Sequence, residues 1–153
     1  MSVKPIEITA YQLAERFVGL SEVSGPVSDP TILAMLRLDQ AWPEGDETPW
    51  CSAFVNYIAW MLRLPRSKRL NARSWLGIGV PVMLGDAEAG FDVAIFSRGS
   101  NAPGPEVLDA PGHVAFLGSV DGPSLLVLGG NQGDRVSLAR YPISRLLGIR
   151  RLR

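Results

Sequence analysis

The sequence predicts an α+β domain in which helices come first and an antiparallel sheet of about five strands follows. Apolar residues recur at helical spacing up to about residue 75, and beyond it they gather in short runs separated by glycine, proline and aspartate. The chain has 153 residues, of which 46% are apolar and 20% charged, as in compact folded proteins. We therefore expect one domain over 1–153, with a helical part over 1–45 and a core over 46–153.

Two helices are predicted in the N-terminal part. The segment from Thr9 to Gln12 has the pattern of a capping box, and a helical apolar face follows it until near Gly19. Asp29 and Pro30 then begin a second helix, because proline suits the first helical turn. The run from Trp42 to Gly45 is expected to end it.

A third helix is predicted from about Pro49 to Leu62, with Thr48 as its cap and Pro49 at its first position. Cys51, the only cysteine, then falls in the first turn, where unpaired N–H groups and the helix dipole favour thiolate. A helix terminus contributes only about 0.3 to 2 kcal/mol, which lowers a thiol pKa from about 8.5 to about 7 or 8. A reactive thiol at this position therefore also needs a base.

The expected sheet begins after a short helical piece around Ala72 to Trp75. The loop from Ser97 to Gly112 is long enough to have a function, and the sheet should pack against the helix that carries Cys51. The predicted strands are Asp92 to Phe96, His113 to Leu117, Leu125 to Leu128, Val136 to Tyr141, and Leu147 to Leu152.

His113 is the only histidine, so the chain contains one thiol and one imidazole, the two groups that a cysteine-nucleophile hydrolase needs. One cysteine and one histidine cannot form a Cys- or His-rich metal site, and a single cysteine cannot form an internal disulfide. We therefore expect neither a metal nor a cofactor. Fifteen basic residues balance fifteen acidic ones, so nucleic acid is not an expected partner. The arginines near the C-terminus are interpreted as a solvated end, and no segment is long enough to span a membrane.

Four segments resemble the NlpC-type and CHAP-type superfamily of cysteine amidases and peptidases, which share a papain-like core. They occur in the family order, from about Glu22 to the C-terminus. The family's Gly-Asp-Val appears here with one inserted residue, Phe91, which affects the local turn. The segments are Trp50 to Val55 on the helix, Phe91 to Phe96 and Gly112 to Leu117 on the first two strands, and Leu128 to Gln132 after the third.

The resemblance implies a papain-like fold with Cys51 as nucleophile, His113 as base and acid, and a polar third residue that orients the imidazole. Asn131 is the best match for the third residue and Gln132 is the reserve candidate. Some members use a glutamate slightly before an asparagine, where this chain has Gly129 and Gly130. Asn131 also fits a second interpretation, in which it only forms a turn. The expected reactive form is a thiolate and imidazolium pair.

The substrate that the resemblance implies is peptidoglycan, cleaved as an N-acetylmuramoyl-L-alanine amidase or as a stem-peptide endopeptidase. Trp50, Trp75 and Gln132 are candidate substrate-binding residues, although both tryptophans also suit a core. The N-terminus has no apolar secretory signal, so we expect synthesis in the bacterial cytoplasm and action on the cell wall after delivery or lysis. This expectation is met by a phage-type lysin, or by a secreted effector that has an immunity or delivery protein as a partner. The alternatives are a catalytically weak papain-like module of a phage or secretion assembly, and acyl transfer to an amine.

Overall fold

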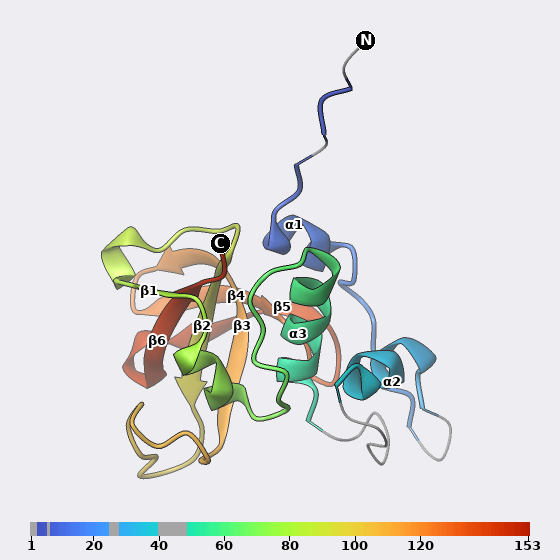
Figure 1. Cartoon of the computed structure of the whole chain (residues 1–153). Helices are drawn as coiled ribbons and strands as arrows, with labels where there is room; N and C mark the ends of the chain where they lie inside the picture. The colour runs from blue at the N-terminus through green and yellow to red at the C-terminus, as the bar shows by residue number, and fades with distance from the viewer. Residues whose placement is uncertain (1–2, 6, 25–27, 40–48) are drawn as a thin grey trace.

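Three α-helices precede a six-stranded antiparallel sheet in the computed structural model, which describes residues 3–5, 7–24, 28–39 and 49–153 (Figure 1). Short 3-10 helices, η1 (Ala72–Gly77), η2 (Leu84–Asp86) and η3 (Ile143–Arg145), lie between or beside the strands. The helices are α1 (Ala10–Glu15), α2 (Pro30–Arg37) and α3 (Cys51–Met61). The strands are β1 (Val80–Val82), β2 (Asp92–Ser97), β3 (Gly112–Asp121), β4 (Ser124–Gly129), β5 (Ser137–Pro142) and β6 (Leu146–Arg151).

The first two helices begin where the sequence predicts. Thr9 and Gln12 form the reciprocal capping box of α1, and the Asp29 carboxylate accepts hydrogen bonds from the first backbone N–H groups of α2. Both helices are shorter than expected, since α1 ends at Glu15 and α2 at Arg37. The segment from Trp42 to Gly45, expected to end the second helix, lies outside the described residues.

The start of α3 differs from the prediction. The helix begins at Cys51 rather than Pro49, and Trp50 occupies the cap position with non-helical dihedral angles and no side-chain cap hydrogen bond. The indole of Trp50 is instead buried and donates a hydrogen bond to Glu22 Oε1 at 2.6 Å. Packing of this large side chain therefore sets the start of the helix. Thr48, the expected cap, lies outside the residues described.

The sheet order is β1-β6-β2-β3-β4-β5, and every neighbouring pair is antiparallel. Five strands match the predicted ones, although β3 continues four residues further, to Asp121. The prediction missed β1, because three residues around Pro81 form too short a run to give an alternating pattern. The α+β class and the antiparallel sheet are confirmed.

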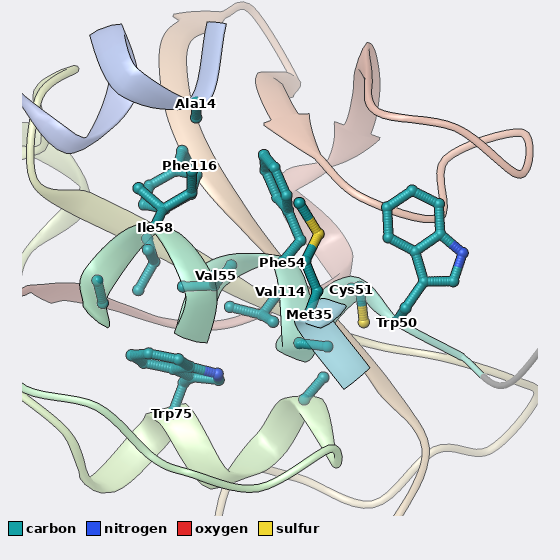
Figure 2. Packing of buried hydrophobic residues seen from close by; sticks show 14 of the residues in the cluster. Ala14, Met35, Trp50, Cys51, Phe54, Val55, Ile58, Trp75, Val114 and Phe116 are labelled. Carbon is teal, nitrogen blue, oxygen red and sulfur yellow. The ribbon is translucent and has the colours of Figure 1, made fainter. Parts of the chain in front are cut away.

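The two faces of the sheet contain separate cores. Val114 and Phe116 of β3 pack with Phe54 and Ile58 of α3 on one face, as Figure 2 shows. The intervening residues Ala115 and Leu117 belong to a second cluster on the other face, because successive side chains of a strand point to opposite sides. From His113 to Leu117, before the register of β3 shifts, the odd-numbered residues therefore point away from α3.

The second cluster lies within a strongly curved sheet. The rings of Phe96 in β2 and Tyr141 in β5 stack with centroids 4.9 Å apart. Two strands separate β2 from β5, so a flat sheet would hold their backbones about 14 Å apart. Curvature towards this face brings the two rings together.

Trp50 and Trp75 are core residues, and their predicted role in a substrate groove is wrong. Both side chains are fully buried, and Figure 2 shows Trp75 beneath α3 and Trp50 at the start of that helix. Each indole N–H has a protein partner, Glu22 for Trp50 and the Ser52 hydroxyl for Trp75. An aromatic side chain with its polar atom satisfied inside the protein presents nothing to a ligand.

The C-terminal arginines are not all solvated. Arg151 in β6 donates two hydrogen bonds to the buried carboxylate of Asp92, at 2.7 and 3.0 Å, and so ties the last strand to β2. Asp92 needs this partner because a buried carboxylate is costly unless it is paired. Among the described residues no helix is both long enough and apolar enough to cross a membrane.

Candidate active site

Cys51 lies at the junction of α3, β3 and a surface pocket. The side chain is 4% exposed and faces the backbone amide of Val114, the residue that follows His113 in β3. The pocket encloses about 340 Å³ and has mostly apolar walls. Its lining residues are Pro49, Cys51, Leu70, Asn71, Ala72, Arg98, Ala110, Pro111 and Gly112.

Burial dominates the protonation of this thiol. Desolvation raises the pKa of Cys51 above its usual value, although the Val114 amide, the Arg98 charge and the backbone amides at the helix start all act to lower it. The balance is opposite to the sequence-based expectation, in which the helix terminus lowers the thiol pKa. The expectation was wrong because the first turn of α3 is inside the protein, where removal from water outweighs the dipole.

His113 is fully buried at the start of β3, on the face of the sheet away from α3. Its ring stacks on Tyr141 with centroids 4.7 Å apart and planes 12° apart. Both ring nitrogens have partners: Nδ1 lies 3.2 Å from Arg98 Nη2, and Nε2 lies 2.8 Å from Gln132 Oε1. The imidazole therefore has a fixed position and orientation.

These partners determine the tautomer. A guanidinium can only donate, so Nδ1 must be the acceptor and carry no proton. Nε2 then carries the proton and donates to Gln132 Oε1, while the other end of that amide donates to the Ser137 carbonyl at 2.7 Å. The basic lone pair of His113 thus points towards Arg98, which also lines the pocket at Cys51.

Burial, together with the Arg98 charge, lowers the pKa of His113 to about 4, although the hydrogen bond that the ring donates to Gln132 acts to raise it. The imidazole is therefore neutral at pH 7, as is the thiol of Cys51. This neutral pair differs from the expected thiolate and imidazolium. Both groups are too far removed from water for separated charges to be favoured at rest.

Arg98 connects the two expected catalytic residues. No hydrogen bond joins Cys51 to His113 among the residues described, because Arg98 and Gln132 occupy both ring nitrogens. The guanidinium of Arg98 acts on both groups, as a hydrogen-bond donor to Nδ1 and as a charge that favours thiolate at Cys51. Arg98 thus links the pocket that contains Cys51 to the buried pair of His113 and Gln132, which do not themselves line that pocket.

Gln132, rather than Asn131, contacts the imidazole. Asn131 has a φ of +58°, a left-handed conformation that asparagine tolerates better than most residues, and it carries the chain through the turn after β4. That is the second interpretation that the sequence allowed for Asn131. Gln132 is 6% exposed and takes the place of an orienting residue.

Two glycines make room for this arrangement. A Cβ atom on Gly129 would lie 2.8 Å from Gln132 Oε1, and one on Gly130 would lie 2.7 Å from the ring of Trp50. Side chains at these positions would displace the amide that holds His113 and the indole that sets the start of α3. The site therefore requires glycine at both positions: Gly129 leaves room for Gln132, and Gly130 leaves room for Trp50.

Arg73 in η1 holds the long loop that forms the pocket wall. Its guanidinium is fully buried and donates to the carbonyls of Pro103, Gly104, Val107 and Pro111, at 2.7 to 3.0 Å. Four charge-assisted hydrogen bonds fix a segment that has no strand or helix of its own. The pocket therefore has an ordered wall.

The sequence reasoning missed both arginines. Arg98 could have been found, because it follows β2 at the sheet end where His113 begins the adjacent antiparallel strand, with Phe96 opposite His113. Arg73 has no such signal, since a lone arginine in a short helical piece is normally exposed. In the part of the chain that is described, no three His, Cys, Asp or Glu side chains lie together as a metal site would need.

Comparison with known proteins adds no family assignment. No protein-family model matches the chain, and no curated protein has significant similarity to it. The function must therefore be argued from the residues and their geometry.

Proposed function

We propose that this domain is a cysteine amidase or peptidase with a papain-like core that hydrolyses an amide bond of peptidoglycan. The observation that carries the proposal is the tautomer of His113. Its unprotonated Nδ1 points to Arg98, which shares a pocket with the thiol of Cys51, and Gln132 holds Nε2–H on the other side. A cysteine hydrolase needs an imidazole that a partner on one ring nitrogen holds in a single tautomer, which leaves the other nitrogen as the base.

The reaction would begin with proton transfer from the Cys51 thiol to His113 Nδ1. The sulfur then attacks the amide carbonyl, and the imidazolium returns the proton to the nitrogen as the C–N bond breaks, which releases an amine and leaves a thioester. Water, deprotonated by Nδ1, attacks the thioester, and the acid and the thiol are regenerated. The backbone N–H groups at the start of α3 are available to the oxyanion.

Arg98 must leave Nδ1 before the first proton transfer, since one lone pair cannot serve both groups. The side chain is only partly buried and lines the pocket, so a rotation does not disturb the core. The neutral resting pair would then become reactive only when a ligand occupies the pocket. A buried site commonly limits side reactions in this way.

The test is digestion of purified peptidoglycan by the wild type and by Cys51→Ala, with the products identified by mass spectrometry. We expect soluble fragments from the wild type only. The masses would also distinguish cleavage between sugar and stem peptide from cleavage within the peptide. Equal release by both proteins would refute the thiol mechanism, and thermal unfolding of the variant would show that its fold is intact.

The competing function is a papain-like binding or structural module of a phage or secretion assembly. The occupied Nδ1 and the raised thiol pKa favour it, because a protein that has lost catalytic activity would also have a histidine that cannot accept the thiol proton. Co-sedimentation decides between the two: a module would bind peptidoglycan and release nothing, and Cys51→Ala would bind equally well. Product coupled to an added amine would indicate acyl transfer instead of hydrolysis.

We also propose that the protein acts on the cell wall after delivery or lysis, as a phage-type lysin or a secreted antibacterial effector. Its substrate lies outside the cytoplasm, so expression directed to the periplasm should lyse bacteria and cytoplasmic expression should not. Cys51→Ala should be harmless in both compartments. Lysis that persists in this variant would contradict an enzymatic cause.

A further inference from the structure

Arg98 is a cation that forms no ion pair with any carboxylate in the described part of the chain. Among the described residues its one hydrogen bond goes to a neutral ring nitrogen, His113 Nδ1. A guanidinium has five N–H groups and is always charged. Several donors of Arg98 are therefore available to a ligand.

The pocket around this cation favours an anionic group. Its walls include Pro49, Leu70, Ala72 and Pro111, which supply apolar surface, and Arg98 is the only charged side chain among the described residues that line it. Apolar walls reduce the screening of a charge by water and so strengthen its attraction for an anion. Planar guanidinium and planar carboxylate match through two parallel hydrogen bonds.

We propose that Arg98 binds a carboxylate of the substrate and that this contact withdraws the guanidinium from His113 Nδ1. The substrate class is thus a peptide stem with a free carboxylate near the amide bond that is cut. The proposal that Arg98 binds a carboxylate is argued from the pocket residues alone. The proposal that this contact promotes catalysis rests on the proposed hydrolase function.

The consequence is that substrate binding itself frees the lone pair of His113 Nδ1. At rest Arg98 donates to Nδ1, and the base has no free lone pair for the thiol. A carboxylate offers Arg98 stronger, charge-assisted hydrogen bonds than a neutral imidazole does. Nδ1 is then free to accept the proton of Cys51.

The first experiment compares alkylation of Cys51 by iodoacetate and by iodoacetamide, which differ in a carboxylate. The measured quantity is the ratio of the two rate constants. Because Arg98 lies beside the thiol, we expect the ratio to fall about tenfold in Arg98→Gln. Arg98→Lys should keep most of the preference, because it keeps the charge.

Arg145→Gln is the matched control, since it removes the same charge from an exposed position that does not line the pocket. It should leave the ratio unchanged. An equal ratio in wild type and Arg98→Gln would overturn the proposal. Alkylation of the wild type by iodoacetamide but not by iodoacetate would also overturn it, because the pocket would then not admit a carboxylate to Cys51.

The second experiment uses two muropeptides with the same stem, one with free carboxyl groups and one in which they are carboxamides. We expect Cys51→Ala to bind the free form about tenfold more tightly, and Arg98→Gln to cleave both forms at similar, low rates. Equal cleavage of both forms by the wild type would refute the role of Arg98 and keep the hydrolase. Preferential binding without any cleavage by the wild type would refute the hydrolase and keep the carboxylate site.

Discussion

Two arginines are associated with the pocket at Cys51, and their surroundings differ: Arg98 lines it, and Arg73 holds the loop that forms its wall. Arg73 is fully buried and donates to four carbonyl groups of one loop. Arg98 is partly buried and has one hydrogen bond, to a neutral histidine. A cation that uses four of its five N–H groups within the protein is part of the framework, whereas one that uses a single N–H is placed to meet a ligand.

The largest expected effect tests this difference directly. Arg73→Met removes four charge-assisted hydrogen bonds to partly buried loop carbonyls, and we expect it to lower the free energy of unfolding by about 4 kcal/mol. Arg98→Met should change it by less than about 1 kcal/mol, because only one hydrogen bond is lost. Urea unfolding of the two variants measures both. Equal losses would mean that Arg98 is also a framework residue.

The second prediction concerns acid. His113 has a pKa of about 4 in the folded protein and about 6.5 when unfolded, so between these values the unfolded chain binds more protons. Stability from this group is complete above pH 6.5 and is lost as the pH falls towards 4, by roughly 3 kcal/mol in total.

His113→Phe provides the control, because it can keep the stack on Tyr141 and does not titrate. The measurement is the difference between wild type and variant in unfolding free energy from pH 7 to pH 4. A difference independent of pH would show that His113 is not held neutral. This result would also weaken the contrast between the two arginines, since Arg98 then would not face a neutral partner.

The third prediction asks which residue holds the imidazole. Gln132→Ala removes the acceptor of His113 Nε2–H and the side-chain donor to the Ser137 carbonyl, and should cost about 2 kcal/mol of stability. Its neighbour is the control: Asn131→Gly should be neutral or slightly stabilising, since glycine adopts a φ of +58° readily. In the variant without Gln132, the NMR signals of the imidazole should show ring disorder. A larger loss from Asn131→Gly would restore Asn131 as the orienting residue.

Much of the fold could be predicted because its signals are local. Capping residues begin α1 and α2, and five strands follow from apolar runs bounded by turn residues. Cys51 and His113 could be found because each is the only residue of its type. The burial of individual side chains could not be predicted from such local signals. It reversed the expected pKa of Cys51, and it placed Trp50 and Trp75 in the core, because exposure depends on contacts between distant segments.

The smallest expected effect concerns how the framework positions the thiol. A Cβ atom on Gly130 would lie 2.7 to 2.8 Å from Trp50 and Phe54, so Gly130→Ala should cost about 1 to 2 kcal/mol and shift the start of α3. Gly77→Ala is the control, because a Cβ there meets no atom within 4 Å. The shift should change the alkylation rate of Cys51 in Gly130→Ala and leave it unchanged in Gly77→Ala. Gly130→Ala could instead lower stability and leave the alkylation rate unchanged. That result would mean that the position of the thiol depends on Val114 and on the pocket wall, which Arg73 holds in place, rather than on the start of α3.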